Sequence, residues 1–206
     1  MKSSSKHWDA VFLGAEDSKL GWYEKEASRT LRLLNLVPNW KNSTLFLPGA
    51  GTSVLIEELL SNGAKLILND ISMEALNWVK GRLSDEYNSI KWLCQDIAHP
   101  INDAIQEVDI WIDRAVLHFL TDEEDIKGYF ENVKSTLKSD GYAIFAEFSK
   151  TGAVKCAGLL VHRYSIKEIS ENLGSSFKLI SHFDYTYISP HGDPKPYIYT
   201  LYKRED

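Results

Sequence analysis

The sequence is poor in cysteine and has no long apolar run. Only two cysteines, Cys94 and Cys156, occur in 206 residues, and they form no CxxC pair. This scarcity argues against a disulfide-stabilised secreted protein and a structural zinc site, so we expect a reduced, cytoplasmic setting and no metal. No apolar run approaches the length that spans a bilayer, and no segment resembles a secretory leader. We therefore expect no membrane association.

Basic residues are also fewer than acidic residues. Lys and Arg number 23 against 29 Asp and Glu, which gives a formal net charge of -6. This balance argues against a broad surface for nucleic acid, so we expect no nucleic-acid partner. Hydrophobic residues make up 44% and charged residues 25%, as in an ordinary globular protein. The length suits one α/β domain, and a small or neutral molecule is the partner that the charge favours.

The most informative stretch covers residues 44–70 and reads TLFLPGAGTSVLIEELLSNGAKLILND. Two apolar runs flank a glycine turn and a helix-patterned segment, and the second run ends at Asp70. The pattern predicts a strand, a glycine turn, a helix, a second strand and an acid. Gly49 and Gly51, on either side of Ala50, can adopt positive φ and let a ligand approach the backbone. An acid at the next strand tip can bind a ribose, so the stretch predicts a nucleoside-containing cofactor.

The glycine spacing separates two classes of such cofactors. A dinucleotide favours G-x-G-x-x-G, but Val54 stands at the third glycine position and no basic residue is near the turn. S-adenosylmethionine has no phosphate and needs only close approach to the backbone, for which Gly49 and Gly51 suffice. We therefore expect S-adenosylmethionine as the cofactor. The alternative is a tight turn with a purely structural role.

The rest of the chain alternates helices with strands as far as Phe148. Helical periodicity covers the segments 24–36, 72–83 and 122–137. Strand-like apolar runs cover 90–94, 108–112 and 141–148. We expect Ser72 and Thr121 to cap two of the helices. The alternation predicts a parallel, doubly wound sheet with helices on both faces. The segment 6–23 is too irregular to predict one amphipathic helix.

The pattern changes after residue 148. A helix is expected from near Ser165 to Gly174, and two β-rich runs, 177–188 and 197–202, should pair as an antiparallel hairpin. A seven-stranded, mostly parallel sheet that ends in such a hairpin is the plan of class I methyltransferases, whereas a dehydrogenase would continue with parallel βα units. We expect a single domain over 1–206, with a lid segment at 1–23, a cofactor-binding core at 24–148 and a substrate-side loop, helix and hairpin at 149–206.

Several motifs carry a resemblance to a known family. They are His7-Trp8-Asp9, Trp22-Tyr23, DRAVLHFLTD from Asp113 to Asp122, Cys156 to Leu159, and Arg163 to Ser165. On these motifs the chain resembles class I S-adenosylmethionine-dependent methyltransferases, and within them a bacterial group of methyltransferase-domain proteins. It is more distantly similar to thiopurine methyltransferases, through Pro48 before the glycine turn and the pair Asp113-Arg114.

The resemblance implies which residues bind the cofactor. Gly49, Ala50 and Gly51 match the turn that carries the methionine portion. Asp70 matches the ribose-binding acid, and Ile71 the residue that packs on the adenine. The family's adenine-binding acid and its neighbouring amide match Asp96 and Ile97. Where the family has an acid before the turn and a third glycine, this chain has Leu47 and Ser53.

Further residues are candidates for the reacting end of the site. Asp113 is expected to face the sulfonium and amino group of the cofactor. Arg114 is expected to fix an anionic group of the acceptor, with an internal ion pair as the alternative. His118 is a candidate general base or a hydrogen-bonded wall residue. Trp22 is either a lid over the sulfonium or a staple of the N-terminal segment. Cys156 is not expected to be a nucleophile, because the sequence places no base beside it.

These residues predict an S-adenosylmethionine-dependent methyltransferase that acts on a small-molecule acceptor by direct in-line displacement. Two alternatives within the enzyme class are a thiopurine-like thiol S-methyltransferase and a protein lysine N-methyltransferase, whose substrate would be a protein. A third alternative is a module that binds the cofactor without turnover.

Overall fold

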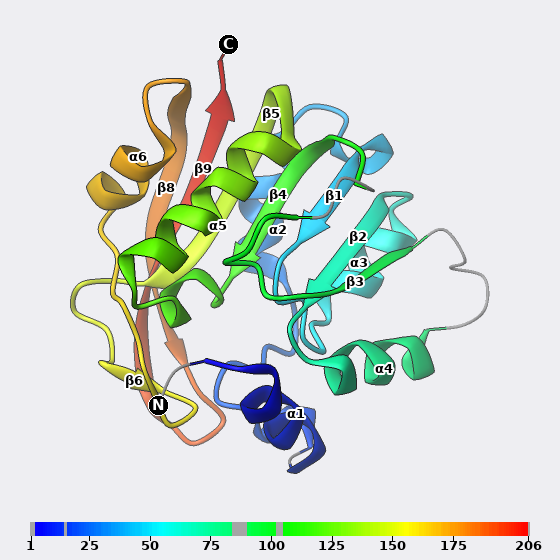
Figure 1. Ribbon diagram of the computed structural model, residues 1–206, viewed down its shortest axis with the longest axis vertical. Helices are drawn as coiled ribbons and strands as arrows, with labels where there is room; N and C mark the ends of the chain where they lie inside the picture. Colours follow the sequence, from blue (N-terminus) through cyan, green and yellow to red (C-terminus); the bar gives the residue numbers. More distant parts are fainter. Residues whose placement is uncertain (1–2, 15, 84–89, 102–104, 206) are drawn as a thin grey trace.

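The computed structural model describes residues 3–14, 16–83, 90–101 and 105–205. Seven of its strands form one sheet: β1 (Thr44–Leu47), β2 (Lys65–Asp70), β3 (Lys91–Cys94), β4 (Val108–Arg114), β5 (Leu137–Phe148), β8 (Phe177–Ile188) and β9 (Pro194–Arg204). Their order is β3-β2-β1-β4-β5-β9-β8 (Figure 1). Strands β1 to β5 run parallel, and β9 pairs antiparallel with both β5 and β8. The predicted fold class is therefore confirmed.

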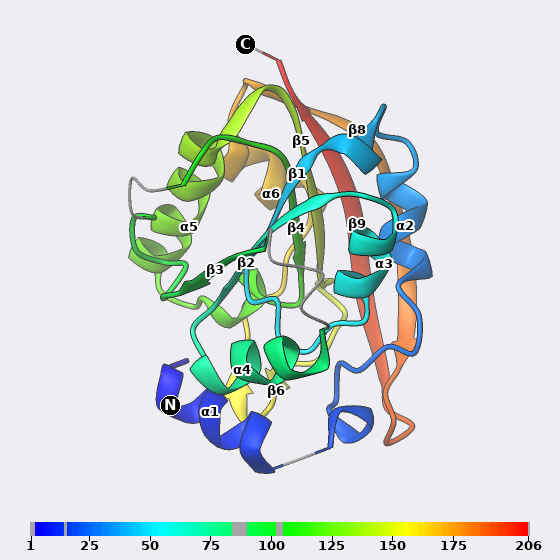
Figure 2. The same cartoon turned by 90° about the vertical axis from the view of Figure 1, so that its right-hand side faces the viewer.

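Helices cover both faces of this sheet (Figure 2). They are α1 (Ser5–Gly14), α2 (Ser28–Leu34), α3 (Leu55–Ser61), α4 (Met73–Arg82), α5 (Glu123–Thr136) and α6 (Ile166–Leu173). Apolar side chains of α2, α3 and α4 share one core with one face of the sheet, and those of α5 and α6 share a second core with the other. Among the described residues, no helix has both the length and the apolar character that crossing a membrane requires.

Local sequence signals set several helix ends. The Ser72 side chain caps α4 by accepting from the backbone N–H of Ala75 at 3.2 Å, as expected. Ser165 and Glu168 form a capping box at the start of α6. The expected Thr121 cap is wrong by one residue, because α5 begins at Glu123 with Asp122 as its N-cap.

Three elements differ more from expectation. Helix α2 covers only Ser28–Leu34 of the predicted 24–36, because residues 21–24 form a turn and loop that are bound to the body of the protein. Strand β5 begins at Leu137, directly after α5, where Leu137 pairs with Val108. The N-terminal segment contains a full helix, α1, which lies across the end of the sheet toward which β1 and β2 point (Figure 1).

Candidate functional site

A pocket opens at the carboxyl edge of β1, β2 and β4. Its empty space, counted together with the open solvent at its mouth, is about 1170 Å³. The structure brings nine of the predicted site residues to its wall: Trp22, Gly49, Ala50, Gly51, Asp70, Ile71, Asp96, Ile97 and Arg114. The carboxyl edge is where open α/β sheets bind ligands, so the topology alone concentrates these residues at one place.

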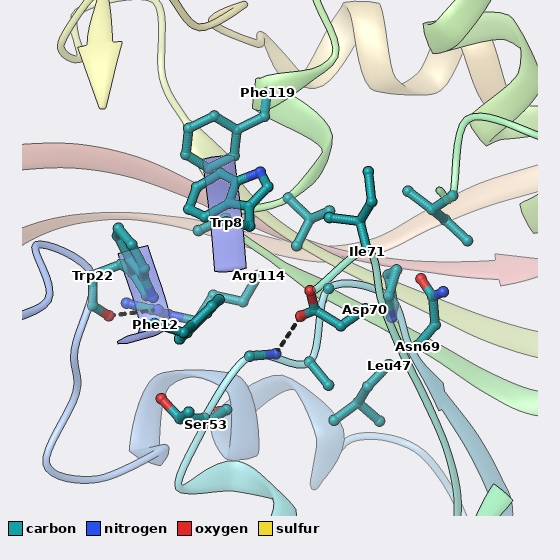
Figure 3. Close-up of a pocket in the computed structure, with 18 of the residues that line it drawn as sticks. Trp8, Phe12, Trp22, Leu47, Ser53, Asn69, Asp70, Ile71, Arg114 and Phe119 are labelled. Carbon is teal, nitrogen blue, oxygen red and sulfur yellow. Dashed lines mark hydrogen bonds between the residues drawn. The ribbon is translucent and has the colours of Figure 1, made fainter. Parts of the chain in front are cut away.

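The glycine turn after β1 has the backbone conformation that its sequence predicts. Gly49 and Gly51 have φ angles of 48° and 52°, a region that favours glycine. A side chain on Gly49 would place its Cβ 2.4 Å from Cγ2 of Val116, so the turn also needs the missing side chain for space. The N–H of Gly51 donates to Oδ2 of Asp70 at 2.8 Å (Figure 3). The turn and the acid of β2 therefore form one unit.

Asp70 combines burial with unusual basicity. Its side chain is only 4% exposed, and its two oxygens accept from the N–H groups of Gly51 and Ser72, each at 2.8 Å. Burial raises the pKa of Asp70 to about 6, although these backbone hydrogen bonds act in the opposite direction. Each carboxylate oxygen has a second lone pair, so the group can still accept from a ligand hydroxyl.

The loop after β3 is fixed by a residue that the sequence did not indicate. Oδ1 of Asp96 accepts from the N–H of Ala98 at 2.9 Å. On α5, the buried Asn132 donates from Nδ2 to the carbonyls of Ile97 and His99, at 2.8 and 2.7 Å. This amide positions Asp96 and Ile97 at the pocket wall. A polar residue on the apolar face of α5 was the only signal that could have identified Asn132.

A second supporting residue holds the glycine turn from outside. Arg82, in the last turn of α4, donates from Nη1 to the carbonyl of Thr52 at 2.8 Å and from Nη2 to that of Ser53 at 3.0 Å. The guanidinium is also paired with Glu57 of α3. Arg82 therefore connects the turn to two helices. No local pattern distinguishes it from other basic residues near helix ends.

Helix α1 is fastened over the pocket by one acid. Oδ1 of Asp9 accepts from Oγ of Ser72 at 2.6 Å, at the N-terminus of α4. The helix thereby turns Trp8 and Phe12 toward the pocket, opposite Asp70 (Figure 3). These two side chains are one helical turn apart, which explains how so irregular a segment can form an aromatic face.

The aromatic face of α1 continues into a cluster with two other rings. Trp8 lies edge-on to Trp22, with centroids 5.6 Å apart, and to Phe119, at 4.8 Å. Phe12 also meets Trp22, at 6.3 Å. All four rings line the pocket, so Trp22 serves as wall and staple at once. Their π faces offer an apolar surface that is favourable to a cationic methyl group.

Residues 21–24, which we call the strap, run along the pocket and are tied to the body of the protein at every position. Three carbonyls of the strap accept hydrogen bonds from distant side chains, and its acid forms an ion pair. The contacts are Gly21 with Lys195 Nζ (2.8 Å), Trp22 with Arg114 Nη1 (3.0 Å), Tyr23 with the Tyr187 hydroxyl, and Glu24 with Arg114 Nε (2.9 Å). Arg114 therefore has an ion-pair partner, as one alternative foresaw, and that partner is Glu24.

Two predicted site residues lie elsewhere. Asp113 is 0% exposed and accepts from the backbone N–H groups of Val116 and Leu117, both at 3.1 Å, and from the Tyr129 hydroxyl at 2.5 Å. His118 is also 0% exposed, and neither side chain lines the pocket. The expected contact of Asp113 with the cofactor is therefore corrected, because its side chain is engaged in the interior. Of the two alternatives for His118, the structure agrees with a hydrogen-bonded residue and not with a base at the pocket wall.

These two residues belong to a buried polar network with Glu147 of β5. Nδ1 of His118 lies 2.7 Å from Oε2 of Glu147, whose Oε2 also accepts from the His118 backbone N–H at 3.1 Å. Burial raises the pKa of Glu147 to about 8 and that of Asp113 well above its ordinary value. Two carboxyl groups in one apolar environment cannot both ionise readily, so the pair retains a proton at neutral pH.

Comparison with known proteins agrees with this geometry. A family profile described as "Methyltransferase domain" matches residues 47–145, which contain the last residue of β1, the glycine turn, β2 to β4 and most of β5. These residues are similar to a methyltransferase domain. No curated protein sequence matches the chain. Among the described residues, no group of three or more His, Cys, Asp or Glu side chains could hold a metal ion.

Solved structures resemble the chain at low sequence identity. An S-adenosylmethionine-dependent methyltransferase from Anabaena variabilis has a TM-score of 0.78 and 15% identity, covering 98% of this chain and 93% of its own. The N-methyltransferase NodS from Bradyrhizobium japonicum, in complex with S-adenosyl-L-homocysteine, has a TM-score of 0.73 and 14% identity, covering 99% and 100%. A Burkholderia thailandensis 1,6-didemethyltoxoflavin-N1-methyltransferase has a TM-score of 0.67 and 15% identity, covering 98% of this chain and 84% of its own. These likenesses establish the class I methyltransferase fold of the domain.

Proposed function

We propose that this methyltransferase domain transfers the methyl group of S-adenosylmethionine to a small-molecule acceptor by direct in-line displacement. One observation carries the proposal: a glycine backbone at positive φ and the buried carboxylate of Asp70 meet at the carboxyl edge of the sheet, joined by a hydrogen bond. A purely structural turn would not require this arrangement. Burial disfavours the charged form of Asp70, and yet this carboxyl group lies at the wall of a pocket, where a ligand can reach it.

The wall residues fit the cofactor along its whole length. Asp70 is placed to accept from the ribose hydroxyls, and Ile71 to pack against the adenine. Asp96 and the backbone at Ile97 border the adenine end. The glycine turn leaves room for the methionine portion because no Cβ fills the space beside Val116. The bound cofactor supplies an electrophilic methyl group on a sulfonium.

The acceptor side favours a small molecule with apolar surface. Helix α1 and the strap lie over the pocket, and the rings of Trp8, Trp22 and Phe119 line it. The Arg114 charge is balanced by Glu24 at 2.9 Å, so the site does not require an anionic acceptor. We assign Arg114 a positioning role, in which it keeps the strap closed. Direct displacement needs this chain to orient the acceptor and exclude water, which an enclosed aromatic wall does.

Incubating the protein with a cell extract and methyl-labelled S-adenosylmethionine tests this proposal. We expect label in the small-molecule fraction, and at least tenfold less of it with the Asp70→Asn variant when the cofactor concentration is below its Kd. Asp184→Asn, which changes an exposed acid on β8, is the matched control and should label normally. Label on protein would instead favour the lysine N-methyltransferase alternative. Calorimetric binding of the cofactor product without any labelled acceptor would favour a binding module.

A further inference from the structure

A second cluster of reactive side chains lies outside the pocket, around Cys156. This residue belongs to a short antiparallel hairpin of β6 (Lys155–Cys156) and β7 (Leu159–Leu160). The thiol interacts with His118, whose ring is held by Glu147 through Nδ1 at 2.7 Å. The ring also stacks on Phe148, with centroids 4.5 Å apart. The imidazole is therefore fixed in both position and tilt.

The second ring nitrogen of this imidazole has no competing partner among the described residues. Nε2 of His118 is buried and makes no hydrogen bond of normal geometry to the described part of the chain. Because Glu147 occupies Nδ1, Nε2 is the ring nitrogen that remains for Cys156. A cation stands on another side of the sulfur, where Nζ of Lys195 is 3.9 Å from Sγ. Four groups are thus neighbours in space: the Glu147 carboxyl, the His118 imidazole, the Cys156 thiol and the Lys195 ammonium.

The electrostatics agree with this geometry. Burial alone would raise the pKa of Cys156, but the electrostatic influence of the nearby His118 side chain and the charge of Lys195 outweigh it and lower the pKa. Tyr187 of β8 and Tyr197 of β9 also interact with the sulfur, and each has a raised pKa, so both stay neutral.

We propose that Cys156 is an activated thiol that a small neutral hydroperoxide oxidises to a sulfenic acid. A nucleophile with a base within reach, itself oriented by a third group, is the arrangement that activates thiols. Cys156 is 6% exposed, so a bulky or charged reagent is disfavoured. The hairpin that carries it has two residue pairs and one further backbone hydrogen bond, from the Val161 N–H to the Val154 carbonyl at 3.1 Å. Its Val154 and Leu160 side chains are 56% and 58% exposed, so a local opening of this exposed hairpin would admit peroxide to the sulfur.

The reaction balances with the groups present and one hydrogen peroxide. The thiol proton passes to Nε2 of His118, and the sulfur attacks one peroxide oxygen. An S–O bond forms while the O–O bond breaks, and the departing hydroxide takes the proton from His118 to leave as water. Cys156 is oxidised by two electrons to a sulfenic acid, and the peroxide is reduced. Lys195 stabilises the negative charge on sulfur.

This modification would reach the methyltransferase pocket through Lys195. Its Nζ donates to the carbonyl of Gly21 in the strap at 2.8 Å and also lies 3.9 Å from Sγ. An oxygen added to Cys156 therefore competes for the ammonium that holds the strap. The chemistry of the thiol itself does not depend on the proposed methyl transfer, so the two proposals fail separately.

The second cysteine is an internal control. Cys94 is exposed at the end of β3, and its pKa is raised, chiefly by partial desolvation and by the nearby Asp70 charge. Accessibility alone predicts that Cys94 reacts first. We expect the reverse when the native protein is oxidised with hydrogen peroxide at pH 7, the peroxide is removed with catalase, and the sulfenic acids are then labelled with dimedone in urea. Oxidation, measured by peptide mass spectrometry, should be roughly tenfold faster at Cys156. When the protein is oxidised in urea, both thiols should react alike.

Two variants in a Cys94→Ser background separate the contributions of His118 and Lys195 to the reactivity of Cys156. His118→Asn removes the base, and we expect the Cys156 adduct rate to fall by about tenfold or more. Lys195→Met removes the ammonium from a half-buried surface position, and it should slow the reaction several-fold even where His118→Asn does not fold. The proposal is overturned when native Cys94 reacts at least as fast as Cys156, or when Lys195→Met, folded by circular dichroism, reacts at the original rate.

Discussion

The acid at the tip of β2 makes cofactor affinity depend on pH. Asp70 must be ionised to accept from two ribose hydroxyls with full strength, but its pKa in the unliganded protein is about 6. Binding therefore competes with protonation of the same carboxylate. We expect affinity to be constant above pH 7 and to fall steadily below pH 6.

The magnitude follows from that pKa. When only the ionised form binds, the apparent Kd rises about twofold at pH 6 and about elevenfold at pH 5, or ~1.4 kcal/mol. The stability of the unliganded protein should change in the opposite direction. The folded-state pKa of Asp70 lies above its ordinary value of 3.8. Between these values the folded state binds the extra proton, and its free energy of unfolding falls by up to about 3 kcal/mol as the pH rises.

Titration calorimetry with S-adenosyl-L-homocysteine between pH 5 and 8 measures the affinity, and urea unfolding of the unliganded protein over the same pH range measures the stability. The Asp70→Asn variant should bind about 10- to 100-fold more weakly at pH 7, since it loses charge-assisted hydrogen bonds worth ~1.5–3 kcal/mol. Its Kd should not follow the wild-type pH curve. Asp184→Asn, on the surface of β8, should retain that curve. A wild-type Kd that is equal at pH 5 and pH 7, or a curve that persists in Asp70→Asn, would refute the reasoning.

Two further substitutions test the turn and the buried network by thermal unfolding. Gly49→Ala adds a methyl group 2.4 Å from Val116 at a φ of 48°, so we expect a loss of ~2–4 kcal/mol in unfolding free energy. Its control, Gly81→Ala in α4, meets open space and should gain up to ~1 kcal/mol. Glu147→Gln should cost under ~1 kcal/mol at pH 7, because a pKa of about 8 makes the native group largely neutral. Glu147→Ala should cost ~3 kcal/mol or more, and equal losses would show that Glu147 is ionised.

Sequence patterns predict the parts of this protein whose signals are local. The apolar runs around the glycine turn predict the βαβ unit with its ligand-binding edge, and Ser72 and Ser165 mark helix starts because capping involves neighbouring residues. The strap has no such signal. Its partner Lys195 is 174 residues from Gly21, so only the folded topology brings them together.

The same distinction applies at Cys156. The sequence places no base beside this residue, which is why Cys156 is not expected from the sequence to be a nucleophile. The fold supplies His118 from the turn after β4, and Glu147 from β5, 29 residues farther along the chain. Parallel neighbouring strands end at the same edge, so residues from β4 and β5 meet without any motif linking them.

Asp113 and Arg114 show how one strand divides adjacent residues between two sites. Successive side chains of a strand point to opposite faces of the sheet, and Arg114 shares its side with Ile112, which also lines the pocket. Asp113 points the other way, toward the Tyr129 hydroxyl of α5. Alternation alone therefore argues against placing both members of the pair on one ligand. Arg114 closes the strap over the pocket, while Asp113 fixes the turn that presents His118 to the buried network.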